Sequence, residues 1–326
     1  MRLLMTAMIL SFTCVSAASA QTKSASSAYP NKPIRWIVDF PAGGLSDTIA
    51  RTIGAKLHES LGQPVVVDPR PGAGGLLAYG LGAKATPDGY TLSVISAPFT
   101  VLLSLHDKIP YDTFRDFAPI SLCATAHNVL VAGPKLPAKN VSELIAYAKT
   151  RPQGANFASV GIGSSPHLTG ELLKARAGLT ATHVPFTGSG AALTDLMAGR
   201  VDFMFVNYPA AVPLAKAGRI QMLATAGEKR LRAFPDVPTL AESGFPGFRS
   251  TTWVGLAAPG ATPKAIISRL NGEIVRILKL DDVRERLDGL GFEAQGSTPE
   301  ELRAFLMDEV KRWEKVIKDS GAKATS

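Results

Sequence analysis

The chain has 326 residues, of which 46% are hydrophobic and 19% are charged, and its formal net charge is +8. These proportions exclude a disordered chain, and the length suffices for one large domain or two medium ones. Lysine and arginine are scattered, and the nearest approach to a basic run, residues 228–232, is short and interrupted. We therefore expect no nucleic-acid partner, and a mildly basic surface suits a small anionic ligand.

The first twenty residues predict a signal for export. Arg2 supplies a positive charge, residues 3–15 are apolar but too few to span a bilayer, and residues 18–20 form a small-x-small cleavage motif. We expect cleavage near Ala20–Gln21, followed by a flexible Ser/Ala-rich segment over residues 21–29. A short anchor helix is the alternative interpretation. No later stretch is apolar for 18 residues, so the mature chain is expected to be soluble.

Strand, loop and helix alternate in the first hundred residues. The expected strands are 34–40, 64–68 and 90–95, and the expected helices are 48–61 and 76–85. In the first helix, Ile49, Ile53 and Leu57 have helical spacing, and Ser46 and Asp47 precede it as possible caps. This alternation predicts an α/β fold with a parallel sheet and crossover helices.

The same alternation restarts after residues 129–132. Expected strands are 156–159, 182–186, 201–206 and 220–226, and expected helices are 141–150, 167–177 and 191–199. One further strand, 253–257, precedes three helices expected at 263–278, 282–290 and 299–318. The last helix begins with Thr298 as N-cap and Pro299 at the first helical position. The chain therefore contains two α/β units and a helical end.

Three strand-to-helix loops are rich in glycine, serine and threonine and contain no lysine or arginine. They are residues 41–47, 159–165 and 187–190. Such loops gather at one edge of a parallel sheet, and each ends at a helix N-terminus with unpaired N–H groups and a partial positive charge. Since the first loop lies in one unit and the others in the second, a cleft between the units could bind a carboxylate from both sides. A purely structural role in tight turns remains the alternative.

Other chemistry is missing from the sequence. There is no complete dinucleotide fingerprint, Walker loop, nucleophile elbow or metal-ligand spacing, so we expect no cofactor, no metal and no enzymatic activity. Cys123 is expected to be a buried small hydrophobic residue. His167 could contact a ligand or could pack at a helix start. A hydrolase using Ser164 or Ser165 with His167 is a weak alternative, because a nucleophile and base on one loop seldom have the required geometry.

Several motifs resemble the tripartite tricarboxylate transporter solute-receptor family, also called Bug-type receptors. They are YPNKPI (29–34), FPAGG (40–44), LGQPVVV (61–67), RPGAGG (70–75), PDGYTL (87–92), DFAP (116–119), NVLV (128–131), HVPF (183–186), ALTDL (192–196), FPDVPT (234–239) and GSTPE (296–300). Together they cover nearly the whole mature chain in the family's order.

The resemblance implies a two-lobed periplasmic binding protein of the type II, Venus-flytrap class, with a parallel or mixed sheet flanked by helices in each lobe. Lobe 1 would comprise residues 30–127 and 252–326, and lobe 2 residues 128–251, with hinges at the two strand crossings. Such a receptor is expected to be a periplasmic monomer that captures a small carboxylate and delivers it to the membrane components of a transporter. A sensing receptor for a signalling partner is the alternative.

The loops and the resemblance together give the residues expected to bind the ligand. They are Phe40, Ala42, Gly43, Gly44, Ser46, Asp47, Ser96, Phe99, Ser159, Gly163, Ser164, Ser165, His167, Thr187, Gly188, Ser189, Val206, Asn207 and Tyr208. Val206 stands where family members often have Asp, so a ligand ammonium group would lose its counter-charge. Phe99 and Tyr208 would make the site less polar. We therefore expect a carboxylate with an apolar or aromatic body, such as an aliphatic or aromatic dicarboxylate, rather than an amino acid or a citrate-like polyanion.

Overall fold

The computed structural model describes residues 29–231 and 233–320. The expected signal peptide and cleavage site lie outside these residues, as does the segment 21–28. Tyr29, which was expected to end the flexible segment, is buried instead: its hydroxyl donates to the carbonyl of Gly89 at 2.6 Å and its ring packs on Tyr90. The N-terminal edge of lobe 1 is therefore held in place from Tyr29 onward.

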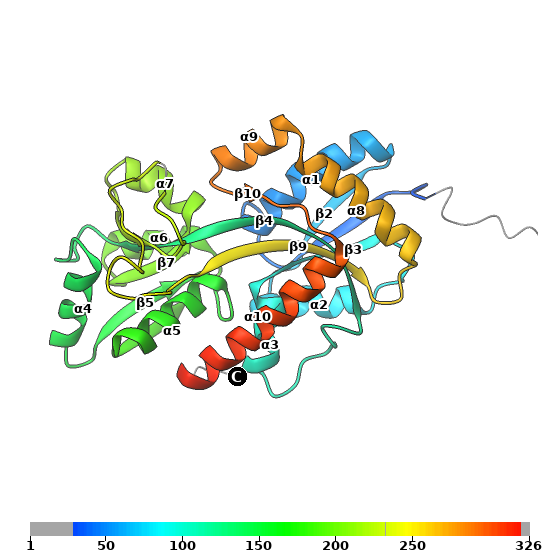
Figure 1. The fold of residues 1–326 in the computed structure, drawn as a ribbon. Helices are drawn as coiled ribbons and strands as arrows, with labels where there is room; N and C mark the ends of the chain where they lie inside the picture. The colour runs from blue at the N-terminus through cyan, green and yellow to red at the C-terminus, as the bar shows by residue number, and fades with distance from the viewer. Residues whose placement is uncertain (1–28, 232, 321–326) are drawn as a thin grey trace, which may run out of the picture.

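The described strands form one mixed sheet (Figure 1). They are β1 (Ile34–Val38), β2 (Val65–Pro69), β3 (Thr91–Ser96), β4 (Phe117–Ala132), β5 (Ala155–Ser159), β6 (Ala181–Pro185), β7 (Phe203–Asn207), β8 (Gln221–Thr225), β9 (Thr251–Pro259) and β10 (Glu293–Ala294). Their order is β2-β1-β3-β9-β4-β7-β5-β6, and β8 and β10 also pair with β4. β1 pairs in parallel with β2 and β3, and β5 pairs in parallel with β6 and β7.

Two long strands, β4 and β9, connect the two halves of the molecule. They run antiparallel from Phe117↔Pro259 to His127↔Thr251. From Asn128 onward β4 pairs with β7 instead, and β8 joins it on the other side. We call the half built on β1–β3 and β10 lobe 1, and the half built on β5–β8 lobe 2. The pairing partner of β4 thus changes between His127 and Asn128.

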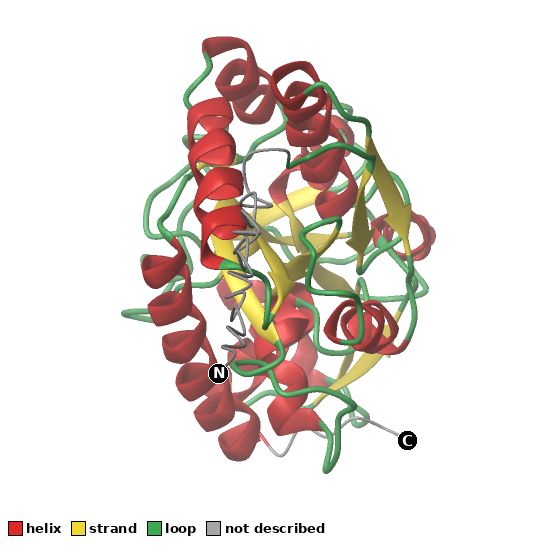
Figure 2. Ribbon diagram, turned by 90° about the vertical axis from the view of Figure 1, so that its right-hand side faces the viewer, coloured by secondary structure: helices red, strands yellow, loops and turns green. Residues whose placement is uncertain are grey.

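Helices cover both faces of the sheet, as the turned view shows (Figure 2). They are α1 (Leu45–Leu61), α2 (Leu76–Ala83), α3 (Ala97–Leu105), α4 (Val141–Thr150), α5 (Ser165–Ala177), α6 (Ser189–Ala198), α7 (Tyr208–Lys216), α8 (Lys264–Leu278), α9 (Asp281–Gly289) and α10 (Pro299–Ser320). In lobe 1, α1, α8 and α9 bury one face of the sheet and α2, α3 and α10 bury the other. In lobe 2, α4 and α5 lie on one face and α6 and α7 on the other.

Side-chain alternation in β7 shows how the sheet of lobe 2 is buried on both faces. Phe203 and Phe205 join the core beneath α4 and α5, whereas Met204 and Val206 join the core beneath α6 and α7. Successive side chains of a strand point to opposite faces, so a strand buried on both sides becomes a continuous apolar run.

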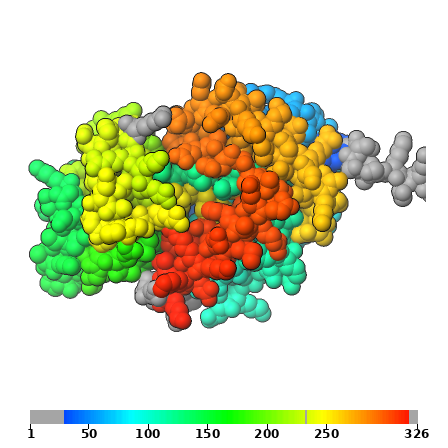
Figure 3. Space-filling view, in the orientation of Figure 1, coloured from blue at the N-terminus to red at the C-terminus, as the bar shows by residue number. Residues whose placement is uncertain are grey.

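Helix α10 crosses from lobe 1 toward lobe 2. In the space-filling view it lies between the two halves and touches the segment around α5 (Figure 3). Trp313 packs with Leu105 of α3 and Leu168 of α5 in one apolar cluster that both lobes share. Within residues 29–231 and 233–320, no helix has the length and apolar character needed to cross a membrane.

Two helices were not expected from the sequence. Residues 96–100, for which no helix was expected, contain the start of α3, where Pro98 occupies the first turn. A proline is tolerated there because its missing N–H has no helical partner in any case. Helix α7 contains Pro213 in its interior, which breaks the sequence pattern of a helix without preventing a short one.

Candidate ligand-binding site

A cavity of about 400 Å³ lies between the two lobes. Its lining comes from the β1–α1 loop, the start of α3, the β5–α5 and β6–α6 loops, the end of β7 and the crossing strand β9. The lining residues are Phe40, Pro41, Ala42, Gly43, Gly44, Leu45, Ser46, Ser96, Ala97, Pro98, Val160, Ser164, Ser165, Pro166, Thr187, Gly188, Ser189, Gly190, Ala191, Asn207 and Thr252. None of them is charged, so any charge on a ligand must be met by dipoles and neutral hydrogen-bonding groups.

Helix N-termini supply those dipoles. Helix α1 of lobe 1 begins at Leu45, and helices α5 and α6 of lobe 2 begin at Ser165 and Ser189, all of which line the cavity. Gly188 precedes α6 with φ 147°, a backbone angle that favours glycine, and no side chain caps that helix. The first N–H groups of each helix lack helical partners, and together with the dipole they form an anion site.

The two serines at the start of α5 have their hydroxyl groups committed to the protein. Ser164 Oγ donates to the carbonyl of Gly161 at 2.6 Å and accepts from the N–H of His167 at 3.3 Å, as a helix cap. Ser165 Oγ donates to the carbonyl of Thr251 at 3.3 Å. By contrast, Thr187 and Ser189 form no side-chain hydrogen bond within the described chain, so their hydroxyls are available to a ligand.

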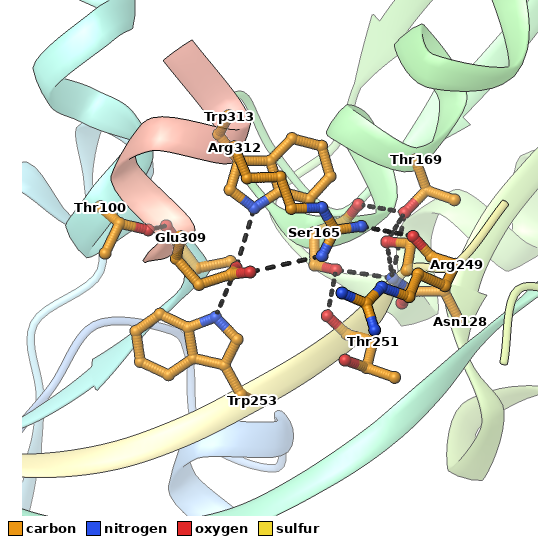
Figure 4. Close-up of polar contacts among 12 residues, drawn as sticks. Thr100, Asn128, Ser165, Thr169, Arg249, Thr251, Trp253, Glu309, Arg312 and Trp313 are labelled. Carbon is orange, nitrogen blue, oxygen red and sulfur yellow. Dashed lines mark hydrogen bonds and ion pairs between the residues drawn. The ribbon is translucent and has the colours of Figure 1, made fainter. Parts of the chain in front are cut away.

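A buried polar cluster ties the cavity wall to the crossing strands (Figure 4). The amide of Asn128, the first β4 residue to pair with lobe 2, donates to Ser165 Oγ at 2.6 Å and also lies 3.1 Å from Thr169 Oγ1 and 3.2 Å from Ser250 Oγ. Its oxygen accepts from the amide of Asn207 at 3.0 Å. Ser165 therefore contacts both β4 and β9 and lines the cavity at the same time.

Two stacked histidines pack against the β5–α5 loop. The rings of His167 and His183 lie 4.0 Å apart, and His167 Nδ1 accepts from the N–H of Gly163 at 3.1 Å. Burial, then the neighbouring His183 and Lys174, lowers the pKa of His167 to about 3. Burial and Lys174 lower the pKa of His183 to about 4, and its Nε2 lies 2.7 Å from Ser159 Oγ. Both rings are neutral at pH 7, and neither lines the cavity.

A buried carboxyl group lies behind the lobe 1 wall. Asp39, directly after β1, is 1% exposed, and one of its oxygens, Oδ2, accepts from Tyr79 and Ser96, both at 2.5 Å. Burial raises the pKa of Asp39, and hydrogen bonds from Ser96, Tyr79 and Ser46 oppose that rise. Asp39 was not among the residues expected to form the site. The available signal was an acid next to the last position of the expected strand 34–40, directly after the apolar run 36–38.

The cavity contains 12 of the 19 residues expected to bind the ligand: Phe40, Ala42, Gly43, Gly44, Ser46, Ser96, Ser164, Ser165, Thr187, Gly188, Ser189 and Asn207. The other seven lie outside its lining: Asp47, Phe99, Ser159, Gly163, His167, Val206 and Tyr208. Several of these act through the lining residues. Asp47, for example, accepts from the N–H of Gly43 at 2.9 Å and pairs with Arg51.

The three residues expected to set specificity do not face the cavity. Phe99 is fully buried among Tyr79, Tyr111 and Phe117 because α3 turns it into the lobe 1 core. Val206 points into the lobe 2 core, since it alternates with Asn207 along β7. Tyr208 packs on Phe234 and lies close to Gly291. Val206 therefore gives no reason to exclude a ligand ammonium group.

Two α/β lobes joined by crossing strands, with helix N-termini around one interlobe cavity, define a solute-binding protein of the periplasmic type. The family model for the tripartite tricarboxylate transporter family receptor matches residues 49–322. The protein BugT from Bordetella pertussis is 41% identical over 297 residues, which cover 90% of this chain and 91% of BugT. The chain belongs to the tripartite tricarboxylate transporter receptor family, as the resemblance in the sequence indicated.

Two similar solved structures contain carboxylates. R. palustris Rpa4515 with adipate has a TM-score of 0.86 and 36% identity, covering 90% of this chain and 98% of that one. MatC from Rhodopseudomonas palustris with bound malate has a TM-score of 0.83 and 36% identity, covering 89% of this chain and 100% of that one. The family consists of solute-binding receptors, and the protein is not an enzyme. Consistently, His167 Nδ1 accepts from a backbone N–H rather than from Ser164 or Ser165.

Proposed function

We propose that this protein is a periplasmic receptor that binds one small carboxylate in the interlobe cavity and delivers it to the membrane components of a tripartite tricarboxylate-type transporter. The observation that carries the proposal is the meeting of the N-termini of α1, α5 and α6, from both lobes, at one cavity without a charged lining residue. The adipate and malate bound by the two similar structures support the same ligand class. The partner transporter follows from the family name.

The geometry can stabilise a carboxylate without a basic side chain. Each helix N-terminus stabilises a neighbouring anion by about 0.3–1 kcal/mol, and by up to ~2 kcal/mol when the site is partly buried. The hydroxyls of Thr187 and Ser189 add donors to those of the α5 and α6 backbone. Hydrogen bonds to a charged group contribute about 1.5–3 kcal/mol each. Such a donor set also avoids holding a lysine or arginine unpaired in the empty receptor.

We further propose that the lobes close about β4 and β9, near residues 128 and 252. The exchange of pairing partners at Asn128 and the approach of the Ser165 hydroxyl to both strands support this hinge. Closure requires that the ligand contact the closed form more favourably than the open form. A sensing role would use the same closure with a different partner.

Thermal unfolding of the mature protein in the presence of sodium salts tests the proposal. The panel contains adipate, malate, aspartate, glutamate, citrate, benzoate and terephthalate, and the diamide of adipic acid serves as the uncharged control. A ligand at 100 times its dissociation constant stabilises the folded state by about 2.7 kcal/mol, which is a clear shift. Small-angle scattering with the best ligand should show compaction. If no carboxylate shifts the transition more than the diamide, the proposed ligand class is wrong.

A further inference from the structure

The two walls of the cavity differ in electrostatic character. On the lobe 2 wall, neither α5 nor α6 has an acidic residue in its first turn. On the lobe 1 wall, α1 carries Asp47 in its first turn, and Asp39 lies directly behind the same loop. Both carboxyl groups are almost fully buried. An acid beside a helix N-terminus offsets the positive end of the dipole. Arg51 pairs with Asp47, but no cationic side chain contributes to the environment of Asp39. The lobe 1 wall is therefore the less favourable of the two walls for a ligand carboxylate.

The hydroxyl groups in front of Asp39 show the same asymmetry. Ser96 lines the cavity, but its hydroxyl donates its single hydrogen to Asp39 Oδ2 at 2.5 Å. The Ser96 side chain therefore does not cap the N-terminus of α3. A hydroxyl has one hydrogen, so Ser96 presents only lone pairs to a ligand. The hydroxyl of Ser46, also in the lining, favours the charged form of Asp39, although its geometry falls short of a standard hydrogen bond.

Two hydroxyl groups donate to one oxygen of the Asp39 carboxyl. Tyr79 and Ser96 both donate to Oδ2, at the 2.5 Å distance of a short O–H···O bond. Burial raises the pKa of Asp39, and these hydrogen bonds oppose the rise. Oδ1 has no partner among the described residues, and no cationic side chain contributes to the environment of Asp39. A buried carboxyl group without a counter-ion thus stands behind the lobe 1 wall.

We propose that Asp39, acting through Ser96, determines specificity by selecting a carboxylate that carries a hydrogen-bond donor, a hydroxyl or an ammonium group, at its opposite end. The carboxylate binds at α5 and α6, and the donor faces Ser96. A second carboxylate at that end would meet oxygen lone pairs and a buried carboxyl group with no cation beside it, and a polar site rejects such a group strongly. This inference rests on the proposed function and specifies its ligand.

Calorimetric titration of the mature protein with two matched series tests this polarity. One series is 4-hydroxybutanoate, 4-aminobutanoate and succinate, and the other is 6-hydroxyhexanoate, 6-aminohexanoate and adipate. Within the series that fits the cavity, a donor-bearing acid should bind about ten-fold or more tightly than the dicarboxylate. Asp39→Asn should shift this preference toward the dicarboxylate by about ten-fold. Asp88→Asn removes a surface carboxylate paired with Lys32 and should leave the preference unchanged.

A second variant covers the case in which Asp39→Asn does not fold. Ser96→Ala keeps the buried acid but removes the accepting oxygen, so it should weaken the donor-bearing acid more than the dicarboxylate. Equal or tighter binding of the dicarboxylate by the wild type would overturn the inference and leave the proposed function standing. So would an unchanged preference in folded Asp39→Asn. If no acid of any length binds, the proposed function fails and the inference fails with it.

Discussion

The histidine pair beneath the β5–α5 loop gives the protein a stability that depends on pH. His167 is buried and His183 is half-buried, and burial lowers the pKa of the first to about 3 and of the second to about 4. An unfolded histidine has a pKa near 6.5, so folding favours the neutral rings. Their contribution is fully present above the unfolded pKa, and it is lost as the pH falls from about 6.5 toward the folded values.

The size of the loss between pH 7 and pH 5.5 depends on the unfolded pKa, because both folded values lie well below this range. Each histidine that must stay neutral in the fold costs about 1.2 kcal/mol over that interval, and the pair about 2.5 kcal/mol. A domain is stable by about 5–15 kcal/mol, so the effect is a substantial fraction of the total. Urea unfolding followed by circular dichroism at the two pH values measures it directly.

A matched variant isolates one member of the pair. His167→Asn keeps an acceptor for the N–H of Gly163 but cannot titrate, so about half of the pH-dependent loss should disappear. His58→Asn removes an exposed histidine of α1 and should behave as the wild type does. A wild-type loss below about 0.5 kcal/mol, or the same loss in His167→Asn, would refute the assignment of neutral, buried rings.

Four further substitutions test the site and the lobe contact. Ser189→Ala should weaken carboxylate binding by about 1–3 kcal/mol in calorimetry. Ser164→Ala should chiefly lower the unfolding temperature, because the Ser164 hydroxyl caps α5. Equal effects of the two substitutions on affinity would contradict this distinction. Glu309→Gln should lower the free energy of unfolding by about 1–3 kcal/mol in urea titration, because one carboxylate oxygen accepts from two indole N–H groups; an unchanged midpoint would exclude that role. Gly74→Ala should reduce ligand affinity without touching the cavity, because its Cβ would lie 2.7 Å from the carbonyl oxygen of Ile162 in lobe 2; unchanged affinity in calorimetry would show that this lobe contact does not matter for closure.

The sequence predicted most of the α/β alternation because apolar periodicity, caps and glycine-rich loops agree in each unit. Helix α1 ends at Gly62 with a left-handed φ of 69°, as its glycine indicated, and Asn140 caps α4 by accepting from the N–H of Glu143. Helices α3 and α7 were not predicted, because Pro98 and Pro213 are residues typical of loops. The tertiary contacts of these two segments favour the helical conformation, and those contacts are not visible in the linear sequence.

The candidate site was predictable in its loops but not in its hydroxyl groups. Composition places Ser164 and Ser165 at a helix start, yet the direction of each hydroxyl depends on partners distant in sequence, such as Thr251. The Phe99 side chain likewise points away from the cavity because it packs in the core with Tyr111 and Phe117. Sequence spacing carries no information about such contacts, because they join residues from different elements.

The positions of Ser165 and α10 together restrict how the lobes can move. Ser165 lines the cavity and hydrogen-bonds to β4 and β9 through Asn128 and Thr251, so a ligand at the N-terminus of α5 acts on the strands about which we propose closure. On another side, the apolar cluster around Trp313 already joins both lobes. If the lobes open about β4 and β9 and this cluster is preserved, the cavity widens on the side away from α10. We therefore expect the ligand to enter opposite the C-terminal helix and to favour the closed state through the contacts that it adds between α1 and α6.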